Sequence, residues 1–272
     1  GLGTGKTFNT INTFYGLYKQ DNSWVAYILL KNTIRKTWEK EINNSFNDKK
    51  FIKNITITNY DGPYANSTFK KVIQDTYQMG KKVVFIIDEV HGFISNVVGN
   101  IKTNRRRALD IYNYIVKHLK QKPFTRIMAL SGTPIVNQPF ELAILFNLLR
   151  PNIFPNNETK FNDLFISEGA NPIINPDTKN VFQRRIMGLV SYFPGMTPDK
   201  FAKKNIYRVK IQMSKYQQSM YEYYEEIEEA LEKQKKFFKR KGKGADVVDT
   251  FKADTRRAGN FVFPNINNKV NA

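Results

Sequence analysis

The chain has 272 residues, of which 41% are hydrophobic and 14% aromatic, so it can bury a sizeable core and does not belong to the disordered class. It contains no cysteine, which excludes a disulfide scaffold and thiolate metal sites and fits a reducing intracellular compartment, and no apolar run approaches the ~18 residues that cross a bilayer. The net charge of +19 attracts polyanions, of which nucleic acid is the commonest, although a Lys- and Asn-rich chain also results from an AT-rich genome.

The sequence opens with GLGTGKT, a glycine-rich segment of the type that cradles phosphate. Gly3, Thr4 and Gly5 form a stretch in which the glycines let successive backbone N–H groups point at one anion. Lys6 is expected to reach the β- and γ-phosphates of a nucleotide, and Thr7 to place its hydroxyl on Mg²⁺. The segment therefore predicts a site for ATP and Mg²⁺, although a GKT triplet also occurs in ordinary glycine-rich loops.

Short apolar segments then alternate with helical patterns. WVAYILL at 24–30 is a continuous apolar run, typical of a strand that is covered on both faces. After it, Ile34, Trp38 and Ile42 lie four residues apart, on one face of a predicted helix. ITITNY at 55–60 predicts a second strand, followed by another helical stretch. This alternation predicts an α/β fold with a mostly parallel sheet.

The next strand, KVVFIID at 82–88, leads directly into an acidic pair. An acid at the carboxyl end of a buried parallel strand lies in the crevice where such sheets bind ligands. Asp88 can hold the Mg²⁺ that Thr7 also contacts, and Glu89 can act as general base on the attacking water. Asp88 also fits an ordinary helix N-cap. His91 is in position for a polar relay to a neighbouring segment.

A further strand, RIMAL at 126–130, leads into the turn SGTP. Ser131 and Thr133 in this turn are in position to hydrogen-bond the acidic motif, although a Gly-Pro turn between a strand and a helix has the same residues. ELAILFNLL at 141–149 predicts a buried helix. His118, on a basic helical stretch before the strand, is expected at the surface.

The composition changes after Pro151. Residues 151–180 are rich in Asn and Pro and predict a loop with one short helix. IYRVKIQM at 206–213 alternates like a strand, and a long helix is expected from Ser214, a candidate N-cap, to about residue 239. The run KQKKFFKRKGKG at 233–244 holds seven basic residues and no acid, which is typical of a solvated helix end or a tether, although a contact with DNA stays open.

Three motifs taken together resemble a known family. GLGTGKT, DEVH at 88–91 and SGTP at 131–134 are in the order and spacing of motifs I, II and III of superfamily 2 helicases. The longer stretch LSGTPIVNQPFELAILFNLLRP and the later IQMSKYQQSMYEYYEEI are similar to the Swi/Snf type. The Lys- and Asn-rich composition and the segments SYFPG at 191–195 and TRRAGNFVFP at 255–264 resemble the Swi/Snf-like ATPases of large DNA viruses. These include early transcription factor subunits and a transcription-linked nucleoside triphosphatase.

The resemblance implies roles at the matching positions. Gly3, Thr4, Gly5, Lys6 and Thr7 would bind ATP, with Mg²⁺ on Thr7 and Asp88. Glu89 would be the base, and His91, Ser131 and Thr133 would couple the nucleotide state to DNA. Lys31 stands where the family often has proline, so no DNA contact is assigned near it.

The resemblance also implies the organisation of the chain. We expect a RecA-like P-loop lobe 1 over residues 1–150 whose first strand is missing, a loop and helical connection over 151–244, and an approach to a second lobe over 245–272. Nothing in 200–272 resembles the motifs that supply an arginine finger. We therefore expect a piece of a longer polypeptide that alone hydrolyses ATP very slowly, since such a finger contributes about 10³–10⁵ in rate.

These observations favour the ATP-binding lobe of a DNA-dependent ATPase that translocates on duplex DNA and acts in viral transcription. Its expected partners are double-stranded DNA and viral RNA polymerase or transcription factor subunits, in the host cytoplasm or the virion. Two alternatives stay open: an RNA helicase of the same superfamily, and a non-catalytic nucleic-acid-binding scaffold. The presence of Lys6, Asp88 and Glu89 together argues against the scaffold.

Overall fold

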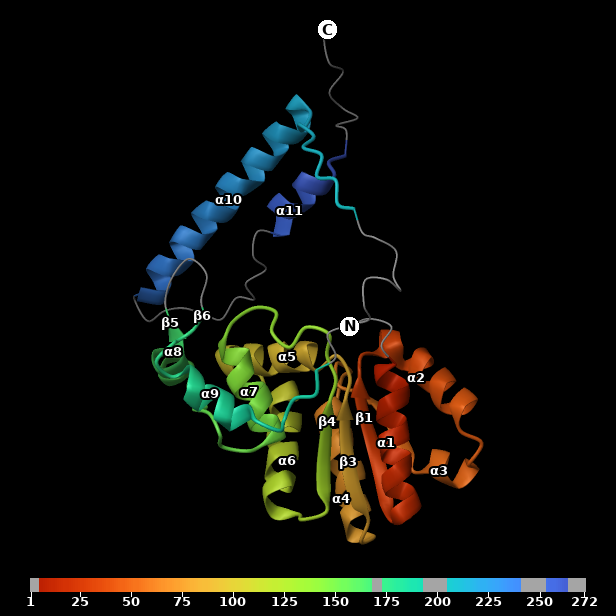
Figure 1. Ribbon diagram of the computed structural model, residues 1–272. Coiled ribbons are helices and arrows are strands. Elements are labelled where there is room, and N and C mark those ends of the chain that lie inside the picture. Colours follow the sequence, from red (N-terminus) through yellow and green to blue (C-terminus); the bar gives the residue numbers. More distant parts are fainter. Residues whose placement is uncertain (1–4, 168–172, 193–204, 241–252, 264–272) are drawn as a thin grey trace. The chain divides into compact units, whose positions relative to one another are not determined.

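The computed structural model describes residues 5–167, 173–192, 205–240 and 253–263 (Figure 1), with the side chains of 232–240 outside the described set. The chain divides into two compact units, residues 1–197 and 198–272. The domain boundaries expected near residues 150 and 244 stay predictions. The basic run 233–244 lies outside the residues whose side chains are described.

A parallel sheet forms the centre of the first unit. Its strands run in the order β2-β1-β3-β4, and every neighbouring pair is parallel. The four strands expected between residues 24 and 130 are all present, so the predicted α/β class with a mostly parallel sheet is confirmed. The strands are β1 (Trp24–Leu30), β2 (Ile55–Asn59), β3 (Lys82–Ile87) and β4 (Thr125–Ala129).

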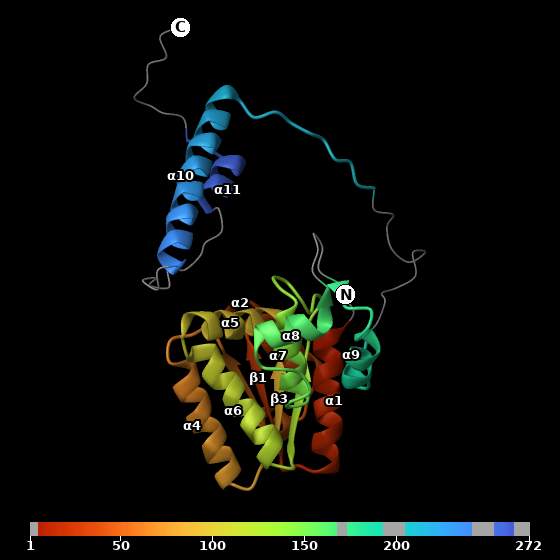
Figure 2. The same cartoon turned by 90° about the vertical axis from the view of Figure 1, so that its left-hand side faces the viewer.

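Helices cover both faces of this sheet (Figures 1 and 2). Successive residues of a strand point to opposite faces, and β3 is buried on both, since Val84 and Ile86 pack in one core while Val83, Phe85 and Ile87 pack in the other. The first core also holds residues of α1 (Lys6–Gln20), α2 (Asn32–Ser45) and α3 (Lys49–Lys53). The second holds residues of α4 (Ala65–Gln78), α5 (Val90–Thr103), α6 (Arg107–Gln121) and α7 (Phe140–Leu149).

Local sequence explains several helix ends. The Asp48 carboxylate accepts from the N–H groups of Lys50 and Phe51 and begins α3. After α4, Gly80 takes a φ of +69°, which glycine adopts at little cost. The predicted helix at 141–149 is confirmed as α7, which is apolar and almost fully buried.

The segment after α7 is more ordered than the sequence predicts. The expected short helix is α8 (Glu158–Phe165), begun by the side chain of Asn157. Two-residue strands, β5 (Ile166–Ser167) and β6 (Ile173–Ile174), pair antiparallel after it, and α9 (Lys179–Ile186) begins at the end of this segment. Phenylalanines from α7, α8, α9 and the intervening loop pack together, which anchors this segment to the core.

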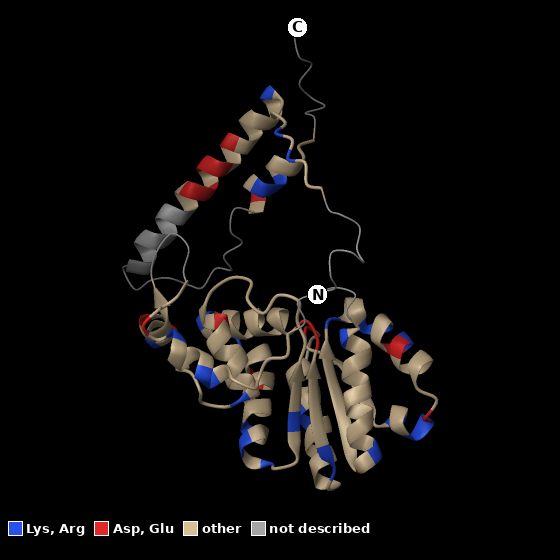
Figure 3. Cartoon of the chain, viewed as in Figure 1, with Lys and Arg blue, Asp and Glu red and all other residues tan. Residues whose placement is uncertain are grey.

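The second unit consists of α10 (Lys215–Arg240) and α11 (Ala253–Asn260), which pack together. Ser214 accepts from the N–H of Gln217, so the expected N-cap is confirmed. The Glu228 carboxylate accepts from the first residues of α11, and the Gln217 amide donates to its last carbonyls. Acidic residues gather in the middle of α10 (Figure 3).

The strand expected at 206–213 is wrong, because residues 205–214 contain no helix or strand and their side chains are exposed. An alternating segment forms a strand only when another strand pairs with its backbone. No helix in the described part of the chain is both long and apolar enough to span a bilayer.

Candidate functional site

The acidic pair lies at the carboxyl edge of the sheet, where β3 ends and α5 begins. It is the acidic turn at the tip of the central strands in Figure 3. The N–H of Asp88 donates to Leu29 O at 3.0 Å, and the N–H of Val90 donates to Leu130 O at 2.9 Å. The turn is therefore fixed to the ends of both neighbouring strands, β1 and β4.

Glu89 has an unusual backbone conformation. Its φ of +47° is left-handed, and it is the N-cap of α5 without a side-chain capping bond. A non-glycine residue in this region carries strain, which often marks a functional position. The sequence left open that the acidic pair is an ordinary helix N-cap. The turn departs from that alternative, because the N-cap is Glu89 and its side chain makes no capping bond.

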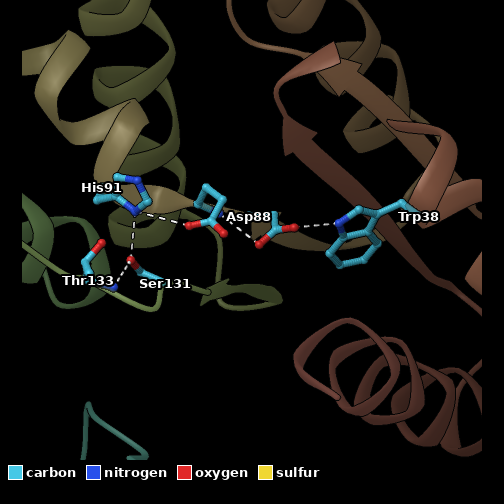
Figure 4. A network of polar contacts seen from close by, with 6 residues as sticks. Trp38, Asp88, His91, Ser131 and Thr133 are labelled. Atoms are coloured by element: carbon cyan, nitrogen blue, oxygen red, sulfur yellow. Dashed lines mark hydrogen bonds and ion pairs between the residues drawn. The ribbon is translucent and has the colours of Figure 1, made fainter. Parts of the chain in front are cut away.

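The carboxylate of Asp88 is held by a tryptophan from another part of the chain (Figure 4). Asp88 is buried, and its Oδ2 accepts from Trp38 Nε1 at 2.6 Å, while its Oδ1 accepts from the N–H of Glu89 at 2.9 Å. Trp38 lies on α2, as the helical spacing predicted, but its role as a donor to Asp88 was not predicted. A carboxylate has about four lone-pair positions, so two donors leave it able to bind Mg²⁺ or its water shell.

Polar contacts continue from Glu89 to the SGTP turn (Figure 4). His91 Nδ1 lies 3.2 Å from Glu89 Oε2 and 2.9 Å from Ser131 Oγ, which in turn accepts from the N–H of Thr133 at 3.0 Å. Ser131 therefore makes both contacts that the sequence suggested: it shapes its own turn and reaches the acidic motif. Thr133 joins through its backbone N–H, which donates to Ser131 and not to the acidic motif.

The described end of the phosphate loop, from Gly5 onward, lies against the SGTP turn. Gly5 has a φ of +71° and directly precedes α1, whose first residues are Lys6 and Thr7. A Cβ built on Gly132 would lie 3.8 Å from Lys6 Nζ, which places the amine beside the SGTP turn. The remaining predicted loop residues, Gly3 and Thr4, lie outside the described residues. A cation at a helix N-terminus is the kind of group that binds the phosphates of a nucleotide.

A buried glutamate fixes the loop that follows the SGTP turn. Glu141, on α7, is 1% exposed, and its carboxylate accepts from Ser95 Oγ at 2.6 Å. It also accepts from the N–H groups of Val136 and Asn137 and from the Asn137 amide. Burial raises the pKa of Glu141, but these hydrogen bonds outweigh burial and leave the pKa below 4.5. The carboxylate ties the loop to α5, which carries Ser95.

A tyrosine lies close to the acidic pair and was not predicted from the sequence. Tyr60, which follows β2, is 1% exposed, and its hydroxyl has no hydrogen-bond partner among the described residues. Burial raises its pKa, and the charges of Asp61, Asp88 and Glu89 add to this effect. A Cβ on Gly92 would lie 3.2 Å from both this hydroxyl and the Lys31 amine, so glycine is needed for the close approach.

The second histidine differs from its prediction. His118 is half-buried rather than on the surface, with its ring 4.9 Å from Tyr77 and 4.1 Å from Tyr114. Burial lowers its pKa, so the neutral ring is favoured. It lies near the end of α6, which leads into the amino end of β4, so it is at the opposite edge of the parallel sheet from the acidic pair.

Comparisons with known proteins give consistent matches. The model of the SNF2-related domain matches residues 1–258. A protein of Acanthamoeba polyphaga mimivirus named as an ATP-dependent RNA helicase is 41% identical and matches 100% of this chain and 34% of its own length. Nucleoside triphosphatase I of Choristoneura biennis entomopoxvirus is 28% identical, over 80% of this chain and 34% of its own length. The chain thus spans about a third of the length of these curated relatives.

Among solved structures, the Sulfolobus solfataricus SWI2/SNF2 ATPase core in complex with dsDNA is also similar. It is 23% identical, with a TM-score of 0.39, and the match covers 60% of this chain and 33% of that one.

Proposed function

The chain belongs to the SNF2-related family, and from that premise we propose that it is the ATP-binding and hydrolysing lobe of a DNA-dependent ATPase that translocates on duplex DNA. The observation that carries the proposal is the unbroken line of polar contacts from Trp38 through Asp88, Glu89 and His91 to Ser131. It joins the carboxylates of Asp88 and Glu89 to the turn beside the Lys6 amine.

Each group in this line has a distinct role in the proposal. Lys6 and the N-terminal end of α1 bind the phosphates, and Thr7 and Asp88 hold Mg²⁺, which neutralises phosphate charge when it is bound. Trp38 donates to Asp88 and fixes the orientation of its carboxylate. Glu89 accepts a proton from the attacking water.

His91 and Ser131 then link hydrolysis to nucleic acid. His91 Nδ1 contacts both Glu89 and Ser131, so a shift of the SGTP turn changes the hydrogen bonding of the base. In this proposal duplex DNA acts on the turn and so orients Glu89 for catalysis. The viral relatives, one of which is named as a nucleoside triphosphatase, support a viral nucleoside triphosphatase, and a role in viral transcription remains part of this proposal.

The proposal is tested with two substitutions in the full-length polypeptide. Lys6→Ala should abolish Mg·ATP binding, whereas Glu89→Gln should retain binding and lower DNA-stimulated hydrolysis by about 10²–10⁴. Lys19→Ala, on the same helix α1 but exposed at its other end, is the control and should behave like the wild type. Stimulated hydrolysis that survives both Lys6→Ala and Glu89→Gln would refute the assigned roles.

An RNA helicase is the second candidate, because the relative at 41% identity is named as one. The two functions share the nucleotide site and differ in the polymer that stimulates it. Hydrolysis rates measured with duplex DNA and with duplex RNA, together with a strand-separation assay on RNA, distinguish them. Strand separation on RNA without stimulation by duplex DNA would favour this second function.

A further inference from the structure

A hollow of about 440 Å³ lies at the far end of α5 from the acidic pair. The residues that give it its character are three consecutive arginines, two asparagines of α5 and one aspartate: Arg105, Arg106, Arg107, Asn96, Asn100 and Asp61. Asp61 follows β2, and Arg105 and Arg106 directly precede α6, whose first residue is Arg107, so the hollow belongs to the carboxyl edge of the sheet, the same edge as the nucleotide site.

The turn that carries the arginines is fixed by α5. Asn100 O accepts from the N–H of Arg105, and its Oδ1 accepts from the N–H of Ala108. Asn104 closes α5 with a φ of +52°, a conformation that asparagine tolerates better than most residues. The arginine side chains therefore start from a defined backbone and not from a free loop.

The three arginines are not equivalent. Arg107 donates to the carbonyl oxygen of Asp61, so it joins the turn to the end of β2. The side chains of Arg105 and Arg106 are exposed and make no hydrogen bond or ion pair with any described residue. The single acid, Asp61, already accepts from Asn96 at 3.1 Å. Two cations are thus directed to solvent beside one exposed carboxylate, which accepts a hydrogen bond from Asn96.

We propose that this hollow binds the phosphodiester backbone of the nucleic-acid duplex, with Arg105 and Arg106 as the phosphate-contacting residues. Guanidinium groups bind phosphate oxygens in bidentate geometry, and the first turn of a long helix, here α6, favours an anion. The open hollow and the adjacent guanidinium groups suit a polymer with closely spaced phosphates better than one small anion. The proposal rests on the proposed function, because it names where that site's polymer binds.

Helix α5 connects this hollow to the nucleotide site. It is 14 residues long, about 21 Å at 1.5 Å per residue, with Glu89 before its first residue and the arginine turn after its last. Phosphates at Arg105 and Arg106 would therefore bind at one end of the helix whose other end holds the base.

The test compares two double variants of the 272-residue chain that remove the same charge. Arg105→Ala/Arg106→Ala alters the hollow, while Lys49→Ala/Lys50→Ala removes two exposed lysines of α3, which leads into the amino end of β2. Binding of a short labelled duplex DNA is measured by fluorescence anisotropy over a series of NaCl concentrations. Thermal melting and Mg·ATP affinity, measured on the same samples, check that each variant is folded.

The arginine variant should reduce the slope of log affinity against log salt by about 1.8, since each phosphate contact contributes about 0.9. At about 0.1 M salt this is roughly a 60-fold loss of affinity. The lysine variant should keep the wild-type slope. The same comparison with duplex RNA shows whether the hollow serves either polymer.

Three results would overturn the proposal. The first two are an unchanged slope in the arginine variant and an equal change of slope in both variants. The third is an arginine variant that still binds the duplex like the wild type but no longer binds a labelled poly-glutamate peptide. The last result would assign the hollow to an acidic protein. The proposed chemistry fails independently, if Glu89→Gln leaves hydrolysis intact. A loss of duplex binding in Arg105→Ala/Arg106→Ala with unchanged Mg·ATP affinity therefore tests the hollow separately from the chemistry at Glu89.

Discussion

Replacing Glu141 by glutamine should destabilise the first unit although the two side chains have the same shape. The Glu141 carboxylate is 1% exposed and accepts four hydrogen bonds. In Glu141→Gln the amide oxygen keeps the donors Ser95 Oγ and Asn137 Nδ2. The new amide nitrogen then faces the backbone N–H groups of Val136 and Asn137, so donors oppose donors.

The loss follows from these two bonds. A hydrogen bond to a charged group contributes about 1.5–3 kcal/mol, so losing two lowers the free energy of unfolding by at least about 3 kcal/mol. For a unit of this size that corresponds to a fall in Tm of roughly 6–12 °C. The half-exposed Glu39 pairs with Arg35 at 2.8 Å on the surface of α2, so Glu39→Gln should cost less than about 0.5 kcal/mol.

The pH dependence adds a second check. The folded pKa of Glu141 lies below its ordinary value of 4.5, so the unfolded state binds more protons as the solution is acidified. The stabilisation by Glu141 is therefore complete above about pH 4.5 and is lost as the pH falls through the folded pKa. Urea unfolding of wild type and Glu141→Gln should give a constant difference above pH 4.5 and a narrowing one below it. A cost no larger than that of Glu39→Gln would refute the argument.

Two further predictions follow from single contacts. Trp38→Phe keeps a ring but removes the donor to Asp88, so the unfolding free energy should fall by about 1.5–3 kcal/mol and the Mg²⁺ concentration needed for ATP binding should rise several-fold. Trp24→Phe on β1 is the control. If Trp38→Phe and Trp24→Phe need the same Mg²⁺ concentration for ATP binding, Trp38 does not orient Asp88 for Mg²⁺. His118 has a lowered pKa, so wild-type stability should decline as the pH falls below about 6.5, whereas His118→Gln should lack this step. If the free energies of urea unfolding of wild type and His118→Gln run parallel against pH, the prediction for His118 is wrong.

The strands and most helices could be predicted because their signals are local. The runs at 24–30 and 82–88 are apolar throughout, which is characteristic of strands buried on both faces, and β1 and β3 are central in the sheet. The segment 206–213 shows the limit of this reasoning. Its alternation is equally local, but a strand also needs a partner, and a single sequence does not show whether one is present.

The contacts that build the candidate site could be predicted only in part. The order of the motifs indicated that Asp88, His91 and Ser131 meet at one edge, since the strands that precede them are parallel. The bond between Trp38 and Asp88 joins residues 50 positions apart and depends on β1 lying next to β3. No spacing rule gives that strand order. Trp38 was correctly placed on the buried face of its helix, but its N–H was not recognised as the functional part.

The arrangement around α5 indicates how the two ends of the site can act together. Val90, Phe93, Ile94, Val97 and Val98 are all buried, so the helix cannot bend into a void and must move as one body with its neighbours. Ser95, near its middle, is bonded to Glu141 and Asn137 and so couples the helix to the loop after Ser131. A phosphate bound at the arginine turn would therefore act on Glu89 through a rigid element that is already tied to the SGTP turn.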